Sequence, residues 1–434
     1  MSRIVIQGAK LIDYRNHYDL KQPAADLYLK DGKIEGVNLG GEVDKRIDAK
    51  GLVLTPALID LHAHLREPGQ EDKEDLTSGL SAAASGGYGT VVSMANTKPP
   101  IDSPEVVRSL IAKAEKIGQA RLRPAATLSR GLQGKELTDF AALKEAGVVM
   151  MTDDGIPVQD SHLMRRACEY AKELDLVIQT HSEEPSLRKA GVMHEGLVSQ
   201  QLGLPGNPSE AEAIMIFRDC EIARMTGAKV HIAHITSKRG MQVVEWFKAQ
   251  GFNNITAEVT PNHLTLTDEV LRNFDPIAKV APPLRTEEDR LYLIGALKRG
   301  VVDHIGTDHA PHTRAEKERD MLEAPFGIAN LEVSFALVYS ELVINQGMNL
   351  AEVLAHFHSK PAKIMNWPLP SLATDEPADL VLLDLEQRRV VRPESFLSKA
   401  KFSPWAAQQL QGWPMMTFVR GEKVYEHERT VVSL

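Results

Sequence analysis

The feature that most constrains the fold is an alternation that repeats from residue 53 to about residue 366. Each unit has a short β-branched apolar run, a polar loop and a segment with helical periodicity, as expected for parallel strands linked by helices. Eight runs have strand character, which favours a closed α/β barrel over an open sheet. They are Leu54–Leu61, Thr90–Ala95, Leu122–Thr127, Val148–Thr152, Leu176–Thr180, Lys229–Ile235, Ile255–Val259 and His304–Thr307.

The helical segments carry residues that helix ends prefer. Ser103-Pro104-Glu105 offers an N-cap, a proline at the first helical position and an acid in the first turn. Pro208-Ser209-Glu210 opens an apolar-periodic stretch that runs to Met225. Glycines such as Gly118 and Gly227 are placed to end these helices.

The two ends of the chain instead contain short alternating runs, such as Ala25–Leu29 and Leu380–Leu385. The pairs Asp31-Gly32 and Arg420-Gly421 are turn signals. Neither end alone is a plausible domain. We therefore predict one small composite β-sandwich domain from residues 1–52 and 374–434, with the barrel domain, residues 53–373, inserted between its two parts.

Composition excludes several classes of protein. The chain is 43% hydrophobic and 25% charged, with a net charge of −9, which argues against disorder and against a nucleic-acid partner. No apolar run approaches the roughly 18 residues of a membrane span, and the N-terminus lacks the apolar core of a secretory signal. The two cysteines, Cys168 and Cys220, lie in predicted helices. We expect a cytoplasmic protein without membrane or nucleic-acid partners.

Metal-binding side chains follow the predicted strands, and a barrel of this kind places its chemistry at the C-terminal ends of its strands. His62 and His64 are two residues apart, so on extended backbone they point to the same side. Asp153 and Asp154 compete for one position, because a loop begins at Gly155 and strand alternation cannot separate them. The expected set supplies enough donors for two divalent ions of the zinc type. It is His62, His64, Asp153, His181, His234 and Asp308.

Most of the 15 histidines are expected to be ordinary core or surface residues. His231 lies three positions before His234 and so on the opposite face of its strand, which favours packing over metal binding. Structural roles are also expected for His263, His304 and His309. Asp60 is expected either to support the metal ligands or to be a buried, hydrogen-bonded aspartate.

A series of longer motifs runs in order along the chain. They are Asp60-Leu61-His62-Ala63-His64-Leu65-Arg66-Glu67-Pro68-Gly69, Met94-Ala95-Asn96-Thr97, Thr152-Asp153-Asp154-Gly155, His181-Ser182-Glu183, Leu202-Gly203-Leu204-Pro205-Gly206, Pro282-Pro283-Leu284-Arg285 and Gly306-Thr307-Asp308-His309-Ala310-Pro311-His312. Together these motifs resemble the dihydroorotase family, in its long bacterial form within the amidohydrolase superfamily. The resemblance extends from residue 2 to the C-terminus.

The resemblance implies a distorted TIM (β/α)8 barrel with a composite β-sandwich. It also implies zinc-dependent, reversible cyclisation of N-carbamoyl-L-aspartate to L-dihydroorotate in de novo pyrimidine biosynthesis. By motif position, one zinc is held by His62, His64 and Asp308, the other by His181 and His234, and Asp153 bridges them. Many relatives bridge with a carboxylated lysine, but no lysine lies between residues 148 and 155 here, so aspartate is expected.

The expected chemistry is hydrolysis and formation of a cyclic amide. Two zinc ions lower the pKa of a shared water towards roughly 7 and supply hydroxide at neutral pH. Asp308 is the expected general base and acid, which takes the water proton and returns it to the ring nitrogen. Arg66 and Asn96 offer donors for the substrate carboxylate, and the resemblance adds His312. The alternative for Arg66 is an ion pair with a nearby glutamate.

Three positions depart from the usual family pattern. Ala281 stands where an asparagine usually contacts the substrate ring, Asn330 where glycine is more frequent, and Asn262 where histidine is common. None belongs to the predicted metal set. We expect Ala281 to weaken recognition of the substrate.

Two other functions stay open. The first is a structural or partner-dependent subunit of an aspartate transcarbamoylase complex, although six intact metal ligands argue against a mere scaffold. The second is a cyclic amidase of the allantoinase or hydantoinase type, against which Arg66, Asn96 and His312 argue together. We expect a homodimer.

Overall fold

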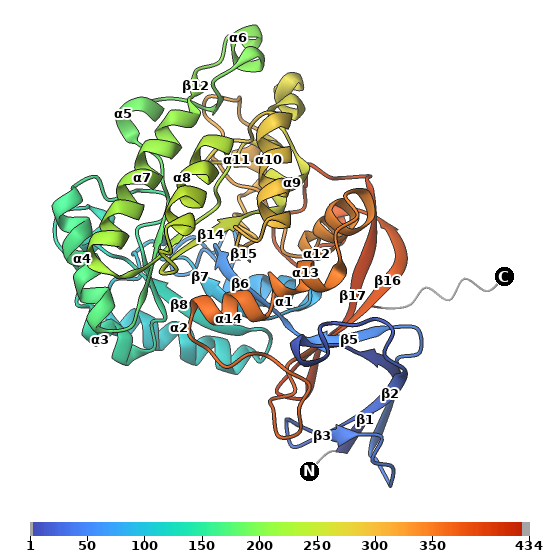
Figure 1. Cartoon of the computed structure of the whole chain (residues 1–434). Coiled ribbons are helices and arrows are strands. Elements are labelled where there is room, and N and C mark those ends of the chain that lie inside the picture. The colour runs from blue at the N-terminus through green and yellow to red at the C-terminus, as the bar shows by residue number, and fades with distance from the viewer. Residues whose placement is uncertain (1–2, 428–434) are drawn as a thin grey trace.

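The computed structural model describes residues 3–427, so the ends of the predicted flanking domain, residues 1–2 and 428–434, lie outside the described part. A parallel eight-stranded sheet curls into a barrel (Figure 1). Its strands are, in order, β6 (Leu58–Ala63), β7 (Tyr88–Ser93), β8 (Arg121–Ala126), β9 (Met150–Thr152), β10 (Val177–Thr180), β13 (Lys229–Ile232), β14 (Ile255–Val259) and β15 (His304–Ile305).

The barrel closes between β6 and the segment that follows β15. The backbone N–H of His64 donates to the carbonyl of His309 over 2.7 Å, and the N–H of Asp308 donates to the carbonyl of His62 over 2.9 Å. This closure brings two predicted metal-binding segments, more than two hundred residues apart in sequence, into contact. The predicted α/β barrel is confirmed.

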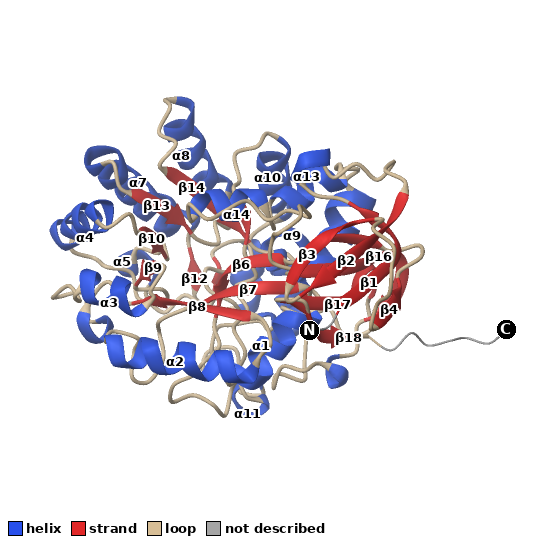
Figure 2. Cartoon of the chain, turned by 90° about the horizontal axis from the view of Figure 1, so that it is seen from below, coloured by secondary structure: helices blue, strands red, loops and turns tan. Residues whose placement is uncertain are grey.

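Helices surround the barrel, and a second sheet lies at its side (Figure 2). The α-helices are α1 (Leu76–Ser85), α2 (Pro104–Ile117), α3 (Phe140–Ala146), α4 (Ser161–Glu173), α5 (Pro185–Arg188), α6 (Leu197–Leu202), α7 (Ser209–Thr226), α8 (Lys238–Ala249), α9 (Pro261–Thr265), α10 (Glu287–Lys298), α11 (Arg314–Lys317), α12 (Ser334–Val338), α13 (Leu350–Ala355) and α14 (Ser359–Ile364). The remaining helical turns are η1 (Tyr14–Asn16), η2 (Arg130–Leu132), η3 (Asp268–Asn273), η4 (Pro276–Ala278), the π-helical η5 (Tyr339–Asn345) and η6 (Pro393–Ser395).

The helix ends follow the sequence signals. Pro104 is the first residue of α2, and Gly118 ends it in the left-handed conformation with φ 69°. Gly227 ends α7 in the same way with φ 74°. Glycine adopts this conformation without the steric cost of a Cβ atom, which is why it is common after helices.

The core lies between strands and helices. Ile178, Val230 and Ala257 from three adjacent strands are fully buried, in one cluster with Ile216 of α7 and Val244 of α8. Burial of each of the valine and isoleucine side chains contributes on the order of 1.5–3 kcal/mol. This packing fixes the strands whose ends carry the site.

The flanking sheet takes strands from both ends of the chain, in the order β18-β17-β16-β5-β1-β2-β3, with β4 paired to β1. Its strands are β1 (Arg3–Leu11), β2 (Ala24–Lys30), β3 (Lys33–Val37), β4 (Lys45–Asp48), β5 (Val53–Pro56), β16 (Leu380–Val390), β17 (Gln409–Val419) and β18 (Glu422–Glu426). A short separate pair is formed by β11 (Met193–His194) and β12 (Gly206–Asn207).

The single strand predicted over Leu54–Leu61 is divided in two. Residues 53–56 form β5, which pairs with β1 and β16, whereas β6 begins at Leu58 and pairs with β7. The chain passes here from one sheet to the other, which an unbroken apolar run does not reveal. The division into domains at residues 52 and 374 stays a prediction.

Two observations concern the rest of the chain. Cys168 on α4 and Cys220 on α7 are both buried and unpaired. None of the helices within residues 3–427 combines the length and apolar character that a membrane crossing requires.

Candidate active site

The predicted metal-binding residues converge at the C-terminal end of the barrel. His62 lies on β6 and His64 one residue beyond it, His181 follows β10, His234 follows two residues after β13, and Asp308 follows β15. The carboxylate that lies among the histidines is that of Asp154, two residues after β9. All of these side chains are buried.

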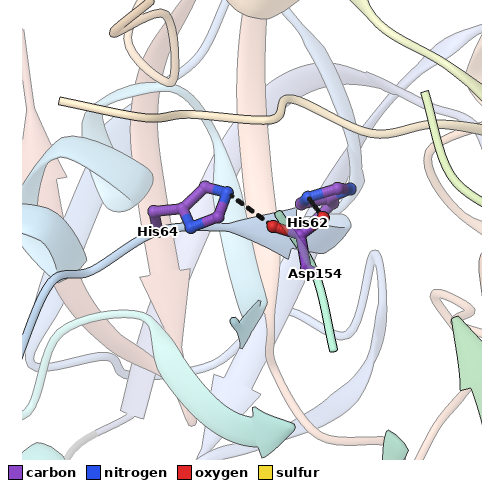
Figure 3. Close-up of side chains that lie close together, drawn as sticks. All are labelled: His62, His64 and Asp154. Atoms are coloured by element: carbon purple, nitrogen blue, oxygen red, sulfur yellow. Dashed lines mark ion pairs between the residues drawn. The ribbon is translucent and has the colours of Figure 1, made fainter. Parts of the chain in front are cut away.

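The cluster consists of two groups that share Asp154. His62, His64 and Asp154 form one group and Asp154, His181 and His234 the other, each with one ligand atom per residue and all these atoms within 4.8 Å of one another. Figure 3 shows the carboxylate of Asp154 between the rings of His62 and His64. Asp154 Oδ1 lies 3.5 Å from His62 Nε2 and from His234 Nε2, and its Oδ2 lies 3.3 Å from His64 Nε2.

Asp153, expected between the two groups, is placed elsewhere, so the expectation for its position is corrected. Its Oδ1 accepts hydrogen bonds from the backbone N–H groups of Leu128 and Ser129, over 2.7 and 3.1 Å. The Ser129 hydroxyl donates to its Oδ2 over 2.5 Å. Asp153 thus ties the loop after β9 to the end of β8. Its neighbour Asp154, which competed with it in the sequence, takes the position in the cluster.

Three of the histidines are oriented through their second ring nitrogen. His62 Nδ1 lies 2.9 Å from Glu258 Oε1, His64 Nδ1 lies 2.9 Å from Asn96 Oδ1, and His181 Nε2 lies 3.0 Å from Glu183 Oε2. Each contact leaves the other ring nitrogen to face Asp154. Histidines that bind metals are usually held in this way by a carboxylate or carbonyl.

The electrostatics of the cluster favour positive charge. Burial alone lowers the pKa of His62, but the carboxylates of Glu258 and Asp154 outweigh burial and hold this pKa well above 6.5. Burial would raise the pKa of Asp154, but the nearby rings of His181, His234 and His62 hold it well below 3.8. The buried carboxylates therefore stabilise a cation among them, either protons on the rings or a metal ion.

Asp308 lies beside the first group. Its Oδ1 is 3.3 Å from His64 Nε2 and 3.6 Å from His62 Nε2. Burial raises the pKa of its carboxyl group, but the hydrogen bond from His64 and the charges of His62 and His234 more than compensate and lower it below 3.8. An ionised carboxylate at this position can accept a proton.

The residues present fit a bound metal pair. His62 Nε2 and Asp154 Oδ1 are buried and have no hydrogen-bond partner, and a buried polar atom without a partner is unfavourable unless an ion satisfies it. Zinc ligands about 2.0–2.2 Å from the ion in a tetrahedron are about 3.4 Å apart. The donor separations of 3.3–3.6 Å around Asp154 and Asp308 agree with that value.

A cavity of about 170 Å³ opens beside the cluster. Arg66, Asn96 and His312, the residues expected to bind a carboxylate, all line it. Arg66 Nε donates to the carbonyl of Pro311 over 3.0 Å, and its Nη2 lies 3.2 Å from His312 Nε2. The same histidine nitrogen donates to the carbonyl of Phe326 over 2.8 Å. Asn96 also donates to the backbone carbonyl of Asp154 over 3.2 Å, so it contacts the cluster as well as the cavity.

The structure adds residues that the sequence did not single out. Glu258, at the end of β14, contacts both His62 and His231. Glu183 contacts His181, and Arg188 and Phe326 line the cavity. Glu183 belongs to a quoted motif and Glu258 occupies the end of a predicted strand, so position along the strands could have indicated both. Arg188 has no such signal, because it lies on the short helix α5.

The parallel barrel with a buried histidine–aspartate cluster at its strand ends defines a metal-dependent hydrolase of the amidohydrolase type. The fold agrees with solved structures: L-hydantoinase from Arthrobacter aurescens aligns with a TM-score of 0.85 at 23% identity, over 100% of this chain and 98% of that one. Dihydropyrimidinase from Brevibacillus agri aligns with a TM-score of 0.81 at 22% identity, over 99% and 96% of the two chains. These likenesses show the fold.

Sequence comparison shows the family. Residues 51–240 match the family model described as "Dihydro-orotase-like". The chain is 52% identical to the dihydroorotase of Deinococcus radiodurans, over 93% of this chain and 96% of that protein. It is 46% identical to the dihydroorotase of Thermus aquaticus, over 98% and 99%. The chain belongs to the dihydroorotase family.

Proposed function

We propose that this chain interconverts N-carbamoyl-L-aspartate and L-dihydroorotate in pyrimidine biosynthesis. The observation that carries the proposal is the juxtaposition, at one cavity, of two His/Asp groups with Arg66 and His312. The His/Asp groups suit hydrolysis of an amide, and Arg66 and His312 suit a substrate that carries a carboxylate. Family membership supports the same reaction.

The metal ions we propose are two zinc ions, because imidazole and carboxylate donors match the preferences of zinc. His62, His64 and Asp308 would hold one ion and His181 and His234 the other, with Asp154 shared. When bound, such a pair lowers the pKa of a water molecule and polarises the amide carbonyl.

Asp308 is the proposed proton carrier. In ring opening, its carboxylate takes a proton from the attacking water and delivers it to the ring nitrogen as the bond between that nitrogen and the carbonyl carbon breaks. In ring closure, the same oxygen takes the proton from the attacking nitrogen and returns it to the carboxyl oxygen that leaves as water when the C–O bond breaks. The lowered pKa of Asp308 keeps the carboxylate ionised and ready to act as the base.

Arg66, Asn96 and His312 are the proposed partners of the carboxylate that the substrate retains in both directions. The guanidinium of Arg66 is buried and held by the carbonyl of Pro311, which limits its rotamers before the substrate arrives. A fixed donor loses less conformational freedom on binding than a mobile one.

The test is a comparison of substrates at equal metal loading. The wild-type chain should turn over carbamoyl aspartate and dihydroorotate, with allantoin and hydantoins at most poor substrates. Asp308→Asn should lower kcat by a factor of about 10² to 10⁴, the usual contribution of a general base. Asp375→Asn is a matched control: this exposed aspartate also has a positive φ, 69° against 46° for Asp308, and should keep full activity. A preferred hydantoin or allantoin substrate would contradict the proposal.

Three further points remain predictions from the sequence: the homodimer, association with an aspartate transcarbamoylase, and a cytoplasmic location. Size-exclusion chromatography of the chain, alone and with a transcarbamoylase, tests the first two. An assay of the chain alone shows whether such a partner is needed for activity. Cell fractionation tests the third.

A further inference from the structure

We propose that Glu74 is a positioning residue that acts through the ring of His309 to fix the backbone of Asp308, the proposed proton carrier. The inference rests on the proposed function. Within residues 3–427, Glu74 belongs neither to the two His/Asp groups nor to the wall of the cavity beside them. Its effect on the reaction is therefore an indirect one.

Asp308 has an unfavourable backbone conformation. Its φ is 46°, in the left-handed region that residues with a Cβ atom rarely adopt. Such a conformation persists only where the surrounding structure imposes it. On the N-terminal side the constraint comes from Asp60, whose carboxylate accepts the backbone N–H of Thr307 over 3.0 Å and the Thr307 hydroxyl over 2.6 Å. On the C-terminal side the neighbour of Asp308 is His309.

His309 is held through both its backbone and its ring. Its backbone N–H donates to the Thr307 hydroxyl over 3.1 Å, and its carbonyl accepts the backbone N–H of His64 over 2.7 Å. Its ring Nδ1 accepts the backbone N–H groups of Asn330 and Leu331 over 3.1 and 3.3 Å. A neutral imidazole carries one N–H, so the acceptor role of Nδ1 places the ring proton on Nε2.

Glu74 faces that proton from a fixed position. Its side chain is fully buried, and its Oε2 lies 3.5 Å from His309 Nε2, an electrostatic contact rather than an aligned hydrogen bond. The hydroxyl groups of Ser78 and Ser398 and the backbone N–H of Lys399 donate to the same carboxylate. These donors come from α1 and from the segment between β16 and β17, so the carboxylate is held from two sides. Its negative charge favours the proton on Nε2, and hence the free Nδ1 that accepts the two backbone N–H groups.

Steady-state kinetics at full zinc loading tests this role. Glu74→Gln keeps the size of the side chain but removes its charge, so kcat should fall about tenfold to hundredfold in both directions, the usual effect of losing an outer partner of this kind. KM should change less than about threefold, because Glu74 does not line the cavity. A merely structural role would lower stability but would leave kcat of the folded, zinc-loaded enzyme unchanged.

Glu332→Gln is the matched control. Glu332 also accepts a hydrogen bond from Ser398, over 2.9 Å from its backbone N–H, but its other partners are Ser85 and Leu397. This variant loosens the same segment between β16 and β17 and should keep the wild-type kcat. An equal fall in kcat for Glu332→Gln would show that the segment, and not the contact with His309, is what matters.

A second variant tests the path through His309. His309→Asn keeps a side-chain acceptor for the two backbone N–H groups but removes the ring nitrogen that faces Glu74. It should lower kcat by a similar factor. Glu74→Gln added to His309→Asn should then cause less than about a threefold further loss, because two residues that act on one path do not have additive effects. Additive losses would show that Glu74 does not act through His309.

Other outcomes would overturn the inference while the proposed function stands. A wild-type kcat for folded, zinc-loaded Glu74→Gln refutes it directly. Loss of bound zinc, measured by elemental analysis, would assign Glu74 to the support of the metal ligands, and a rise in KM alone would assign it to the loop that carries Arg66. If Glu74→Gln does not fold, His309→Asn decides: a fall in kcat at constant KM supports the inference, and a wild-type kcat overturns it. An inactive wild type would instead overturn the proposed function.

Discussion

The carboxylates of Asp153 and Asp154 face different neighbours although the two residues are adjacent. Asp153 accepts hydrogen bonds from the backbone of Leu128 and Ser129, whereas Asp154 Oδ1 lies 3.5 Å from the nitrogens of His62, His181 and His234. The first carboxylate joins two strand ends, and the second lies at the centre of the histidine cluster. The same chemical group therefore serves a structural role at one position and a metal-binding role, as we propose, at the next.

The same substitution, Asp to Asn, should therefore have different effects at positions 153 and 154. Asp154→Asn removes the charge shared by both groups, so we expect bound zinc, measured by elemental analysis after dialysis, to fall by half or more. Asp153→Asn is the matched control and should retain the wild-type zinc content. Because it disturbs three hydrogen bonds to a buried carboxylate, it should lower the free energy of unfolding by about 1–3 kcal/mol. Equal zinc loss in both variants would contradict this division of roles.

The order of strands and the strand ends that carry histidines could be predicted from the sequence. Apolar runs and their spacing identify βα units, and His62, His181 and His234 lie at or just beyond the ends of predicted strands. The choice between Asp153 and Asp154 could not be predicted, because alternation no longer applies once the strand has ended. It depends on N–H groups of Leu128 and Ser129, which lie in another βα unit.

Contacts between distant segments account for the other features that could not be predicted from the sequence. Asn262 and Asn330 each depart from the family pattern, and in the structure Asn330 Nδ2 donates to Asn262 Oδ1 over 2.9 Å. Both side chains are buried. Two departures that appear independent in sequence thus form one contact. Arg188 could not be found from strand position, since α5 reaches the cavity from outside the barrel strands.

Glu258 should tune metal affinity without binding the metal. Its carboxylate contacts His62 Nδ1 over 2.9 Å and accepts the backbone N–H of His234 over 3.1 Å. Glu258→Gln removes the negative charge that faces His62 Nδ1 and helps to orient its ring. We expect a loss of about tenfold to hundredfold in zinc affinity, measured by competition with a chelator. Glu332→Gln, at a partly buried carboxylate that accepts hydrogen bonds from Ser85 and Ser398, should leave zinc affinity unchanged. A wild-type affinity for Glu258→Gln would refute this role.

Asp268 should make stability depend on pH. Burial, and then the charge of Glu269, raises the pKa of Asp268 from 3.8 to about 6. A raised pKa means that the folded chain disfavours the ionised carboxylate, which lowers the free energy of unfolding. This destabilisation is absent below pH 3.8, grows as pH rises from 3.8 and is complete once pH has passed about 6. Asp268→Asn should therefore raise the free energy of unfolding at pH 8 by about 1–2 kcal/mol. The gain should shrink markedly at pH 4.5, as urea unfolding at the two pH values can show. A gain of equal size at both values would exclude titration of Asp268 as its cause.

Two buried lysines fix the segment of residues 311–327 that covers the cavity. Lys317 Nζ donates to the carbonyls of Pro276, Lys279 and Pro325 over 2.8, 3.1 and 3.0 Å. Lys279 Nζ donates in turn to the carbonyls of Met321 and Ala324 over 2.7 and 2.6 Å. The segment carries His312 and Phe326, which line the cavity, so the hydrogen bonds of the two lysines connect the anchoring of the segment to the shape of the substrate site.

Replacing Lys317 should therefore affect both stability and substrate binding. Lys317→Met keeps much of the apolar stem but leaves three carbonyls without their donor, so we expect the free energy of unfolding to fall by about 2–3 kcal/mol. KM for dihydroorotate should rise at the same time, because His312 loses its fixed position, while zinc content stays the same. Arg314→Met removes an exposed charge from the same segment, 74% exposed in its side chain, and should change neither quantity. If Lys317→Met lowered stability with KM unchanged, the lysine would anchor the segment without shaping the site.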